Sequence, residues 1–116
     1  MKIENIISLA QSSGYNEGVK MKFKSEAMRY LKQLAKALNL NPDSFSIRFN
    51  PGGIAVSGDA TLHHEKIYLT VGEMGAFWRT CKGLRDYTGG QNHWIVGFGQ
   101  AIPHNELIQR MQKEIA

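Results

Sequence analysis

This chain contains little cysteine, little proline and no long hydrophobic run. A single cysteine, Cys81, stands among 116 residues, which excludes an internal disulfide and a cysteine-rich zinc site and favours a reducing compartment. No apolar run approaches the roughly 18–20 residues that a membrane-spanning helix needs. The first residues carry Glu4 and Asn5 within their apolar stretch and lack a small-residue cleavage site, so they predict a short helix and no secretion signal. We therefore expect one soluble, cytoplasmic domain over residues 1–116.

The charge is positive overall but is concentrated in two segments. The formal net charge is +4, from 14 Lys and Arg against 10 Asp and Glu. Residues 20–36 and 79–87 together carry a net charge of +7, so the rest of the chain carries −3. A local positive field predicts an anionic partner that binds at one or two places, whereas DNA-coating proteins usually have longer basic runs. A solvated helix face explains the first segment equally well.

Hydrophobic periodicity predicts three helices and a run of strands between the second and the third. Apolar residues recur at helical spacing in 3–10, 27–38 and 107–115, and Pro103 suits the first position of the last helix. Residues 15–18 are expected to form a loop. Between these helices the period changes to two, which is typical of half-buried strands. The expected strands are 45–49, 54–58, 66–71, 76–82 and 93–98, with 61–63 either a separate strand or an extension of 54–58.

Consecutive strands joined by short turns predict the architecture. We expect an α+β fold, in which an antiparallel sheet of about five short strands has two N-terminal helices and one C-terminal helix on one face. The exposed edges of so small a sheet favour assembly with further copies of the chain.

Residues 77–94 combine aromatic, cationic and glycine residues, and they predict a nucleotide-like ligand. Glycines present backbone N–H groups to phosphate oxygens, and arginine binds phosphate through two parallel hydrogen bonds. Aromatic rings stack on bases, and an asparagine can bind the edge of a purine. Strand alternation places one of the two adjacent aromatics at 77 and 78 outside the core, although both the aromatics and the glycines can also be purely structural. The candidate residues are Phe77, Trp78, Arg79, Lys82, Arg85, Tyr87, Asn92 and Trp94.

Known catalytic and metal-binding patterns are missing from the sequence. It contains no P-loop, and Gly97 and Gly99 lack the third glycine of the dinucleotide fingerprint. His63 and His64 would point to opposite faces of a strand, which argues against a metal site. Cys81 has no orienting residue beyond His93, so a nucleophilic site is not favoured. The sequence therefore predicts a binding protein and no enzyme, with no cofactor and no metal.

Two strings resemble a family of small phage proteins, which we identify as the Thoeris anti-defence family of the first type. The strings are RFNPGGIAVSG at 48–58 and RTCKG at 79–83, continued by DYTGG at 86–90 and Asn92. The resemblance covers roughly residues 45–98. It implies a sponge that binds cyclic ADP-ribose isomers made by host TIR-domain enzymes, in the host cytoplasm. It also implies that the protein can sequester the cyclic oligonucleotides of CBASS defence at separate sites within a symmetric homo-oligomer.

The family pocket lies between protomers and combines an aromatic residue, an asparagine and arginines from helices. By resemblance the matching residues here are Phe77 or Trp78, Asn92, Arg29 on the second helix and Arg110 on the last. Arg48 with Asn50 matches a possible second site.

Three other functions are compatible with the sequence. The first is a single-stranded nucleic-acid binder, although long nucleic acid is not the expected partner, and the second is a small phosphodiesterase or lyase that uses His93 or His104. The third is a protein that blocks a partner without any ligand. The basic stripe that the nucleic-acid binder would use is Lys22, Arg29, Lys32 and Lys36.

Overall fold

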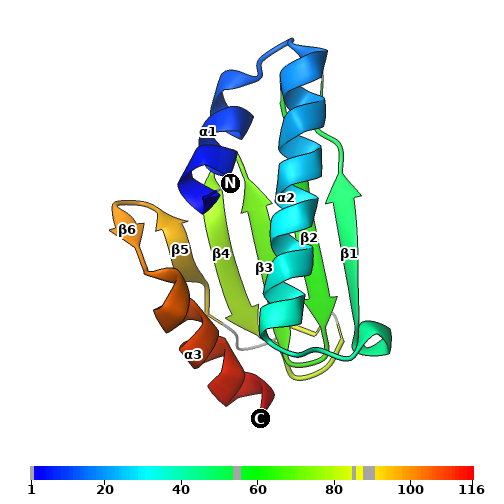
Figure 1. Ribbon diagram of the computed structural model, residues 1–116, viewed down its shortest axis with the longest axis vertical. Coiled ribbons are helices and arrows are strands. Elements are labelled where there is room, and N and C mark those ends of the chain that lie inside the picture. Colours follow the sequence, from blue (N-terminus) through cyan, green and yellow to red (C-terminus); the bar gives the residue numbers. More distant parts are fainter. Residues whose placement is uncertain (1, 54–55, 85, 88–90) are drawn as a thin grey trace.

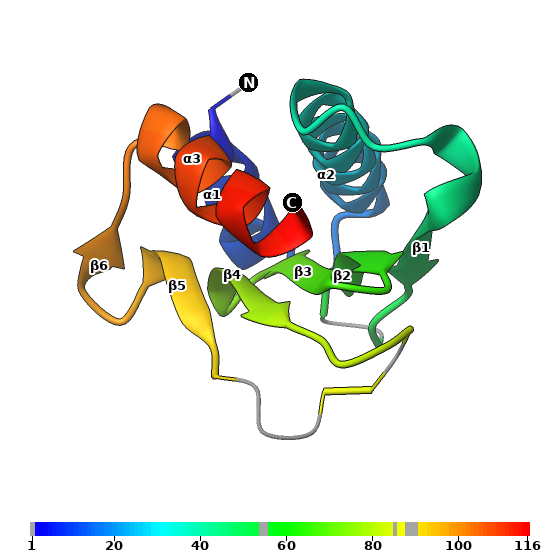
Figure 2. The same ribbon diagram turned by 90° about the horizontal axis from the view of Figure 1, so that it is seen from below.

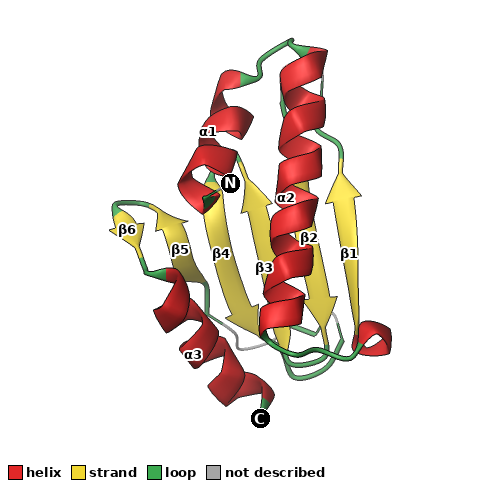
Figure 3. Ribbon diagram, viewed as in Figure 1, coloured by secondary structure: helices red, strands yellow, loops and turns green. Residues whose placement is uncertain are grey.

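The computed structural model describes residues 2–53, 56–84, 86–87 and 91–116. Over these residues the chain forms one antiparallel sheet of six strands in the order β1 to β6, and α1, α2 and α3 lie on one of its faces (Figures 1, 2 and 3). The expected α+β class is confirmed, with six strands in place of about five. Within the described ranges, no helix is long and apolar enough to cross a membrane. The elements are α1 (Ile3–Ser12), α2 (Glu17–Ala37), a 3-10 turn (Pro42–Ser44), β1 (Phe45–Asn50), β2 (Asp59–His64), β3 (Ile67–Gly72), β4 (Gly75–Thr80), β5 (His93–Gly97), β6 (Gln100–Ala101) and α3 (His104–Ile115).

Helix α2 begins earlier than its sequence pattern predicts. The side chain of Asn16 accepts a hydrogen bond from the backbone N–H of Val19 (3.1 Å), which caps the helix and places most of the predicted 15–18 loop inside or directly before it. At the other end Asn39 adopts a positive φ of 57°, and the N–H of Leu40 donates to the Ala35 carbonyl. The expected end of the helix before Pro42 is confirmed.

The core lies between the three helices and one face of the sheet. Leu62, Leu69 and Trp78 are register neighbours across β2, β3 and β4, and all three are buried. Phe23 of α2 and Leu107 of α3 belong to the same buried cluster. Because side chains alternate along each strand, the residues between these positions point to the other face, away from α1, α2 and α3 (Figure 2). We call this second side of the sheet the open face.

The predicted strand at 54–58 is wrong. The partner of β1 is β2, with Asn50 opposite Asp59, and residues 56–58 lie in the intervening loop, while 54 and 55 lie outside the described residues. Gly58 has a φ of +85°, and a Cβ there would lie 2.3 Å from the Asn50 carbonyl oxygen, so the chain turns sharply at this point. Ser57 is buried, and its hydroxyl donates to the Ala10 carbonyl (2.7 Å). Ser57 thus contacts α1 and does not pair with β1 in the way that the alternating pattern of residues 54–58 predicts.

The sequence pattern does not predict β6, because two residues are too few to show a period. Phe98 and Gly99 form the two-residue connection from β5, with φ of 50° and 74°. Positive φ at both positions is typical of the type I′ turns that favour tight hairpins. The expected final strand 93–98 therefore ends at Gly97, and the chain reverses once more before α3.

Candidate functional site

A row of aromatic side chains crosses the open face. Successive rings lie near one another, with centroid distances of 4.7 Å, 6.2 Å, 5.2 Å and 4.6 Å. The rings come from β3, β4 and β5 and from the segments that precede and follow β5. We call the set the aromatic row, and its members in order are Tyr87, Tyr68, Phe77, Trp94 and Phe98.

A pocket of about 430 Å³ lies beside the middle of the aromatic row, and Tyr68, Phe77 and Trp94 line it. Residues of the loop after β1 and of the turn after β3 line this pocket. They come together because β1 and β3 run in the same direction and therefore end on the same side of the sheet (Figure 1). Phe77 and Trp94 line the pocket together with Val56 of the loop. The strand residues Gly72 and Gly75 also line it, and their lack of side chains leaves the space open.

Two glycines position the Trp94 indole. At Gly97, with a φ of +147°, a Cβ would lie 2.8 Å from the indole ring, so the ring packs directly against the strand backbone. At Gly75, with a φ of +124°, a Cβ would lie 2.3 Å from the Val96 carbonyl oxygen. Both positions therefore require glycine, and both hold the indole against the sheet.

The polar groups of this pocket are mainly hydrogen-bond acceptors. Asp59 and Glu73 contribute carboxylates, and Asn50 contributes an amide. Thr70 also lines the pocket, and its hydroxyl is buried without a hydrogen-bond partner among the residues that the structure describes. Over the same described part of the chain, no lysine or arginine lines the pocket.

Tyr87 lies at one end of the aromatic row, against His63 and Tyr68 of the open face. The Tyr87 hydroxyl lies 3.1 Å from Nδ1 of His63, within hydrogen-bond distance, and the ring packs on Tyr68. Arg79 is opposite Tyr68 in the register and is half-buried on the open face. Arg79 is therefore the predicted cation that the structure places beside the aromatic row.

The structure separates the two adjacent aromatics at 77 and 78. Phe77 is half-buried on the open face, whereas Trp78 is 3% exposed and lies under the helices. The Trp78 ring stacks on His93, with centroids 4.6 Å apart. The register that pairs Trp78 with Leu69 aligns it with the core, so Trp78 does not belong to the candidate site. Of the predicted loop residues, Lys82 and Asn92 are exposed, and Arg85 lies outside the described residues together with residues 88–90.

The two helix arginines lie on the other side of the sheet from the aromatic row. A guanidinium nitrogen of Arg29 on α2 lies 3.1 Å from a carboxylate oxygen of Glu26, and one of Arg110 on α3 lies 2.5 Å from a carboxylate oxygen of Glu106. Both arginines are exposed. Within one chain they do not meet the open face. The same holds for the exposed basic stripe of α2 and for His104 at the start of α3.

Arg48 and Asn50 share the open face on β1, and Asn50 lines the same pocket as Phe77 and Trp94. The first string and the segment around the second string thus meet at one pocket within the chain. The sequence analysis did not select Tyr68, Thr70 or Asp59. The signal for the first two was present, because Tyr68 and Thr70 alternate with Ile67, Leu69 and Val71, all of which are buried.

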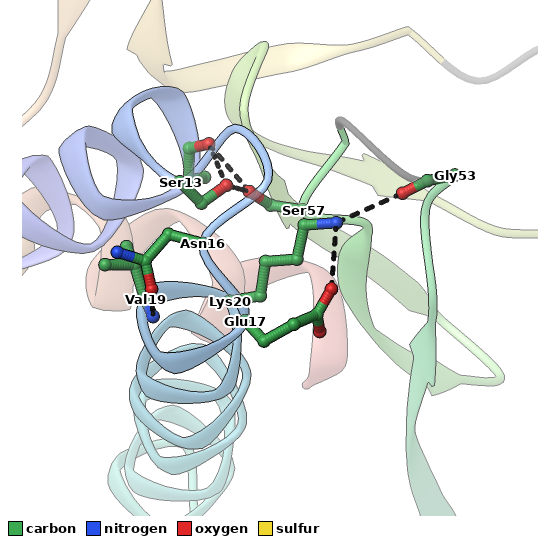
Figure 4. A network of polar contacts seen from close by, with 8 residues as sticks. Ser13, Asn16, Glu17, Val19, Lys20, Gly53 and Ser57 are labelled. Carbon is green, nitrogen blue, oxygen red and sulfur yellow. Dashed lines mark hydrogen bonds and ion pairs between the residues drawn. The ribbon is translucent and has the colours of Figure 1, made fainter.

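A second pocket, of about 550 Å³, lies on the helix side of the same loop. Lys20 and Lys24 line it. The Lys20 ammonium donates to the Gly53 carbonyl oxygen (3.3 Å) and lies 3.7 Å from a carboxylate oxygen of Glu17, and Figure 4 shows both contacts. Lys24 lies over the Phe49 ring, 5.3 Å from its centroid. Residues of the loop after β1 therefore line both pockets, the aromatic, acceptor-rich pocket on one side and the lysine-lined pocket on the other.

Comparison with known proteins gives no further guide to these pockets. No protein-family model, curated protein or solved structure matches this chain. We therefore infer function from the geometry of the open face and from the two strings described above.

Proposed function

We propose that this protein binds a compact cyclic nucleotide on the open face and sequesters it without cleaving it. The ligand class is cyclic ADP-ribose isomers, with cyclic oligonucleotides as a second class. One observation carries the proposal. The first family-like string supplies Asn50 and Val56 to the pocket that also contains Phe77 and Trp94, the aromatics that flank the second string. The first family-like string thus meets two aromatics that flank the second string at a cavity of suitable size, since small-molecule sites span about 300–1,000 Å³.

The energetics of such a complex are attainable. Nanomolar affinity requires about 12 kcal/mol. Base stacking on the aromatic row contributes about 1–3 kcal/mol per ring. Charge-assisted hydrogen bonds from Arg79 and Arg48 to phosphate contribute about 1.5–3 kcal/mol each. Because Phe77 and Trp94 stand on paired strands, little ordering is required when the ligand binds, and most of this interaction energy becomes affinity.

In biological terms the proposal describes a phage anti-defence protein. By binding the messenger in stoichiometric amounts, it would lower the free messenger concentration and inhibit Thoeris immunity, and CBASS immunity where cyclic oligonucleotides also bind. The protein would act in the host cytoplasm as a homo-oligomer. Arg29 and Arg110 would then reach the open face of a neighbouring protomer, since they lie on the helix side of their own chain.

Titration calorimetry with cyclic ADP-ribose isomers tests the proposal. The expected result is stoichiometric binding by the wild type and at least tenfold weaker binding by Trp94→Ala, because one stacking contact is lost. Tyr15→Ala is the matched control, since Tyr15 is an exposed aromatic in the connection between α1 and α2. Intact ligand recovered after heat denaturation indicates sequestration, whereas a changed product indicates an enzyme. Absence of binding by the wild type contradicts the proposal.

The arginine variants test the location of the pocket. Arg29→Ala and Arg110→Ala should weaken binding if protomers share the site, while stability changes by only about 0.3–0.5 kcal/mol because both arginine side chains are exposed. Unchanged affinity in both variants assigns the site to a single chain.

Single-stranded nucleic acid is the second candidate ligand, and the aromatic row favours it, because some sheet-based RNA binders stack bases on such rows. However, the basic stripe of α2 lies on the other side of the sheet, so aromatic and cationic residues do not form one continuous track. Affinity for a long oligonucleotide that exceeds affinity for the cyclic ligand and falls steeply with salt would favour this candidate.

A further inference from the structure

The pocket on the open face is lined by acidic residues, so we expect it to bind a part of a nucleotide other than the phosphates. Asp59 and Glu73 both line it, and neither carboxylate is paired with a cation among the residues that the structure describes. A phosphate placed in this pocket would meet two negative charges. The lysine-lined pocket on the other side of the loop has the opposite character, so the contrast is local and does not follow from the net charge of the chain.

Thr70 is an independent indication that the pocket receives a ligand. The residue is 8% exposed, and its buried hydroxyl has no hydrogen-bond partner within the described part of the chain. Buried hydroxyl groups are nearly always hydrogen-bonded, because an unpaired one loses its contacts with water and gains nothing. Thr70 stands between Thr61 and Phe77 in the register of the open face and lines the pocket. Rotation of the Thr70 side chain would bring this hydroxyl to the pocket surface, where a polar group on a ligand ring can become its missing partner.

We infer that the pocket holds the amino-substituted heteroaromatic ring of the ligand and excludes its phosphates. The ring stacks on Phe77 and Trp94, its exocyclic amino group donates to the Asp59 carboxylate, and a polar atom of the ring pairs with the Thr70 hydroxyl. The phosphates remain outside, on the side of Arg48, which lies two residues before Asn50 on the same face. This inference rests on the proposed function and adds to it that the protein selects bases that carry an amino group.

The test uses a matched pair of ligands. One is a cyclic ADP-ribose isomer whose adenine carries a free amino group, and the other is its deaminated analogue, in which a carbonyl oxygen replaces that group. Calorimetry on the wild type should show about tenfold tighter binding of the amino form, because the carbonyl oxygen would face the Asp59 carboxylate. Asp59→Asn should remove this preference, since an amide offers both a donor and an acceptor. Glu17→Gln is the control, because Glu17 lines the lysine-lined pocket, and it should keep the preference.

Thr70→Val separates ligand recognition from folding. Valine has nearly the same shape and removes a hydroxyl that has no partner in the free protein, so the unfolding midpoint should stay the same or rise. The affinity for the amino form should fall about fivefold. A variant that loses stability and keeps its affinity overturns the role of Thr70.

The outcomes distinguish this inference from the proposed function. Equal affinity of the wild type for the two ligands, or tighter binding of the deaminated form, overturns the inference while cyclic nucleotide binding stands. A tenfold preference that persists in Asp59→Asn also overturns it. If neither ligand binds, the proposed function and the inference fail together.

Discussion

The two faces of the sheet carry similar aromatic side chains at neighbouring positions and use them differently. In β4 Trp78 is buried under the helices, whereas Phe77, the preceding residue, is half-buried on the open face. In β5 Trp94 lies on the open face, whereas His93 stacks on Trp78 on the helix side. Residue type therefore does not distinguish an aromatic of the core from one of the site. What distinguishes them is whether a layer of helices covers that face.

We expect the largest effect from replacing a tryptophan, and we expect the tryptophan on the helix side to contribute more to the free energy of unfolding than the one on the open face. Trp78→Ala should lower the free energy of unfolding by about 3–5 kcal/mol, because it leaves a cavity between the sheet and the helices. Trp94→Ala should lower it by only about 1–2 kcal/mol, since the indole is half-buried and its loss leaves no enclosed cavity. Urea unfolding measures both values. Equal losses would show that the open face is as much a part of the core as the helix side.

The glycines that shape the open face give the next largest effect. Gly75→Ala should cost about 2 kcal/mol or more, because φ is +124° and the new Cβ would lie 2.3 Å from the Val96 carbonyl oxygen. Gly53→Ala is the control, since no atom lies within 4 Å of a Cβ at that position. Its stability should remain within about 0.5 kcal/mol of the wild type. The same urea experiment measures both, and a Gly75→Ala variant as stable as the control contradicts the assigned backbone geometry.

The hydrogen bond between the loop after β1 and helix α1 should contribute less to the free energy of unfolding. Ser57 donates to the Ala10 carbonyl and also contacts the Ser13 hydroxyl (Figure 4). Ser57→Ala should cost about 1 kcal/mol, the typical value of one such hydrogen bond. Binding should also weaken, because the loop lines the pocket. Ser12→Ala is the control, since the Ser12 hydroxyl is exposed and donates only to Leu9 within its own helix. A Ser57→Ala variant that keeps full stability would show that this contact does not hold the loop.

The smallest expected effect depends on pH and separates the two adjacent histidines. His64 lies on the helix side and His63 on the open face. Burial lowers the pKa of His64 below its ordinary value of 6.5, and Glu65 opposes this shift while Lys66 adds to it. The unfolded chain therefore binds this proton more readily than the folded chain. The stability that neutral His64 contributes is complete above pH 6.5 and is lost as the pH falls through 6.5 toward the lowered pKa.

Unfolding free energies at pH 7.5 and 5.5 measure this effect. The wild type should lose more stability between these values than His64→Asn, whose amide oxygen can still accept the hydrogen bond that the Lys66 N–H donates to Nδ1 of His64. An equal loss in both proteins would show that His64 does not titrate differently on folding.

Part of the candidate site could be predicted from the sequence. Phe77, Trp94 and Tyr87 were selected from composition, and strand alternation correctly placed one of the two aromatics at 77 and 78 outside the core. Tyr68 and Thr70 were missed although their alternation with buried residues was visible, because only residues 77–94 combine aromatics, cations and glycines. Asp59 was missed because it falls between the expected strands 54–58 and 61–63.

The sequence by itself determined the α+β class and the positions of most elements, because hydrophobic period reports burial along a single segment. It did not determine the start of α2, the strand that pairs with β1 or the short strand β6. Only the tertiary structure decided which face the helices cover, and with it the burial of Trp78 and the position of Arg29 and Arg110 away from the aromatic row. It also decided that Asn50 and Trp94 line the same pocket. These relations depend on strand register and helix packing, which are contacts between residues far apart in the chain, and no local pattern contains them.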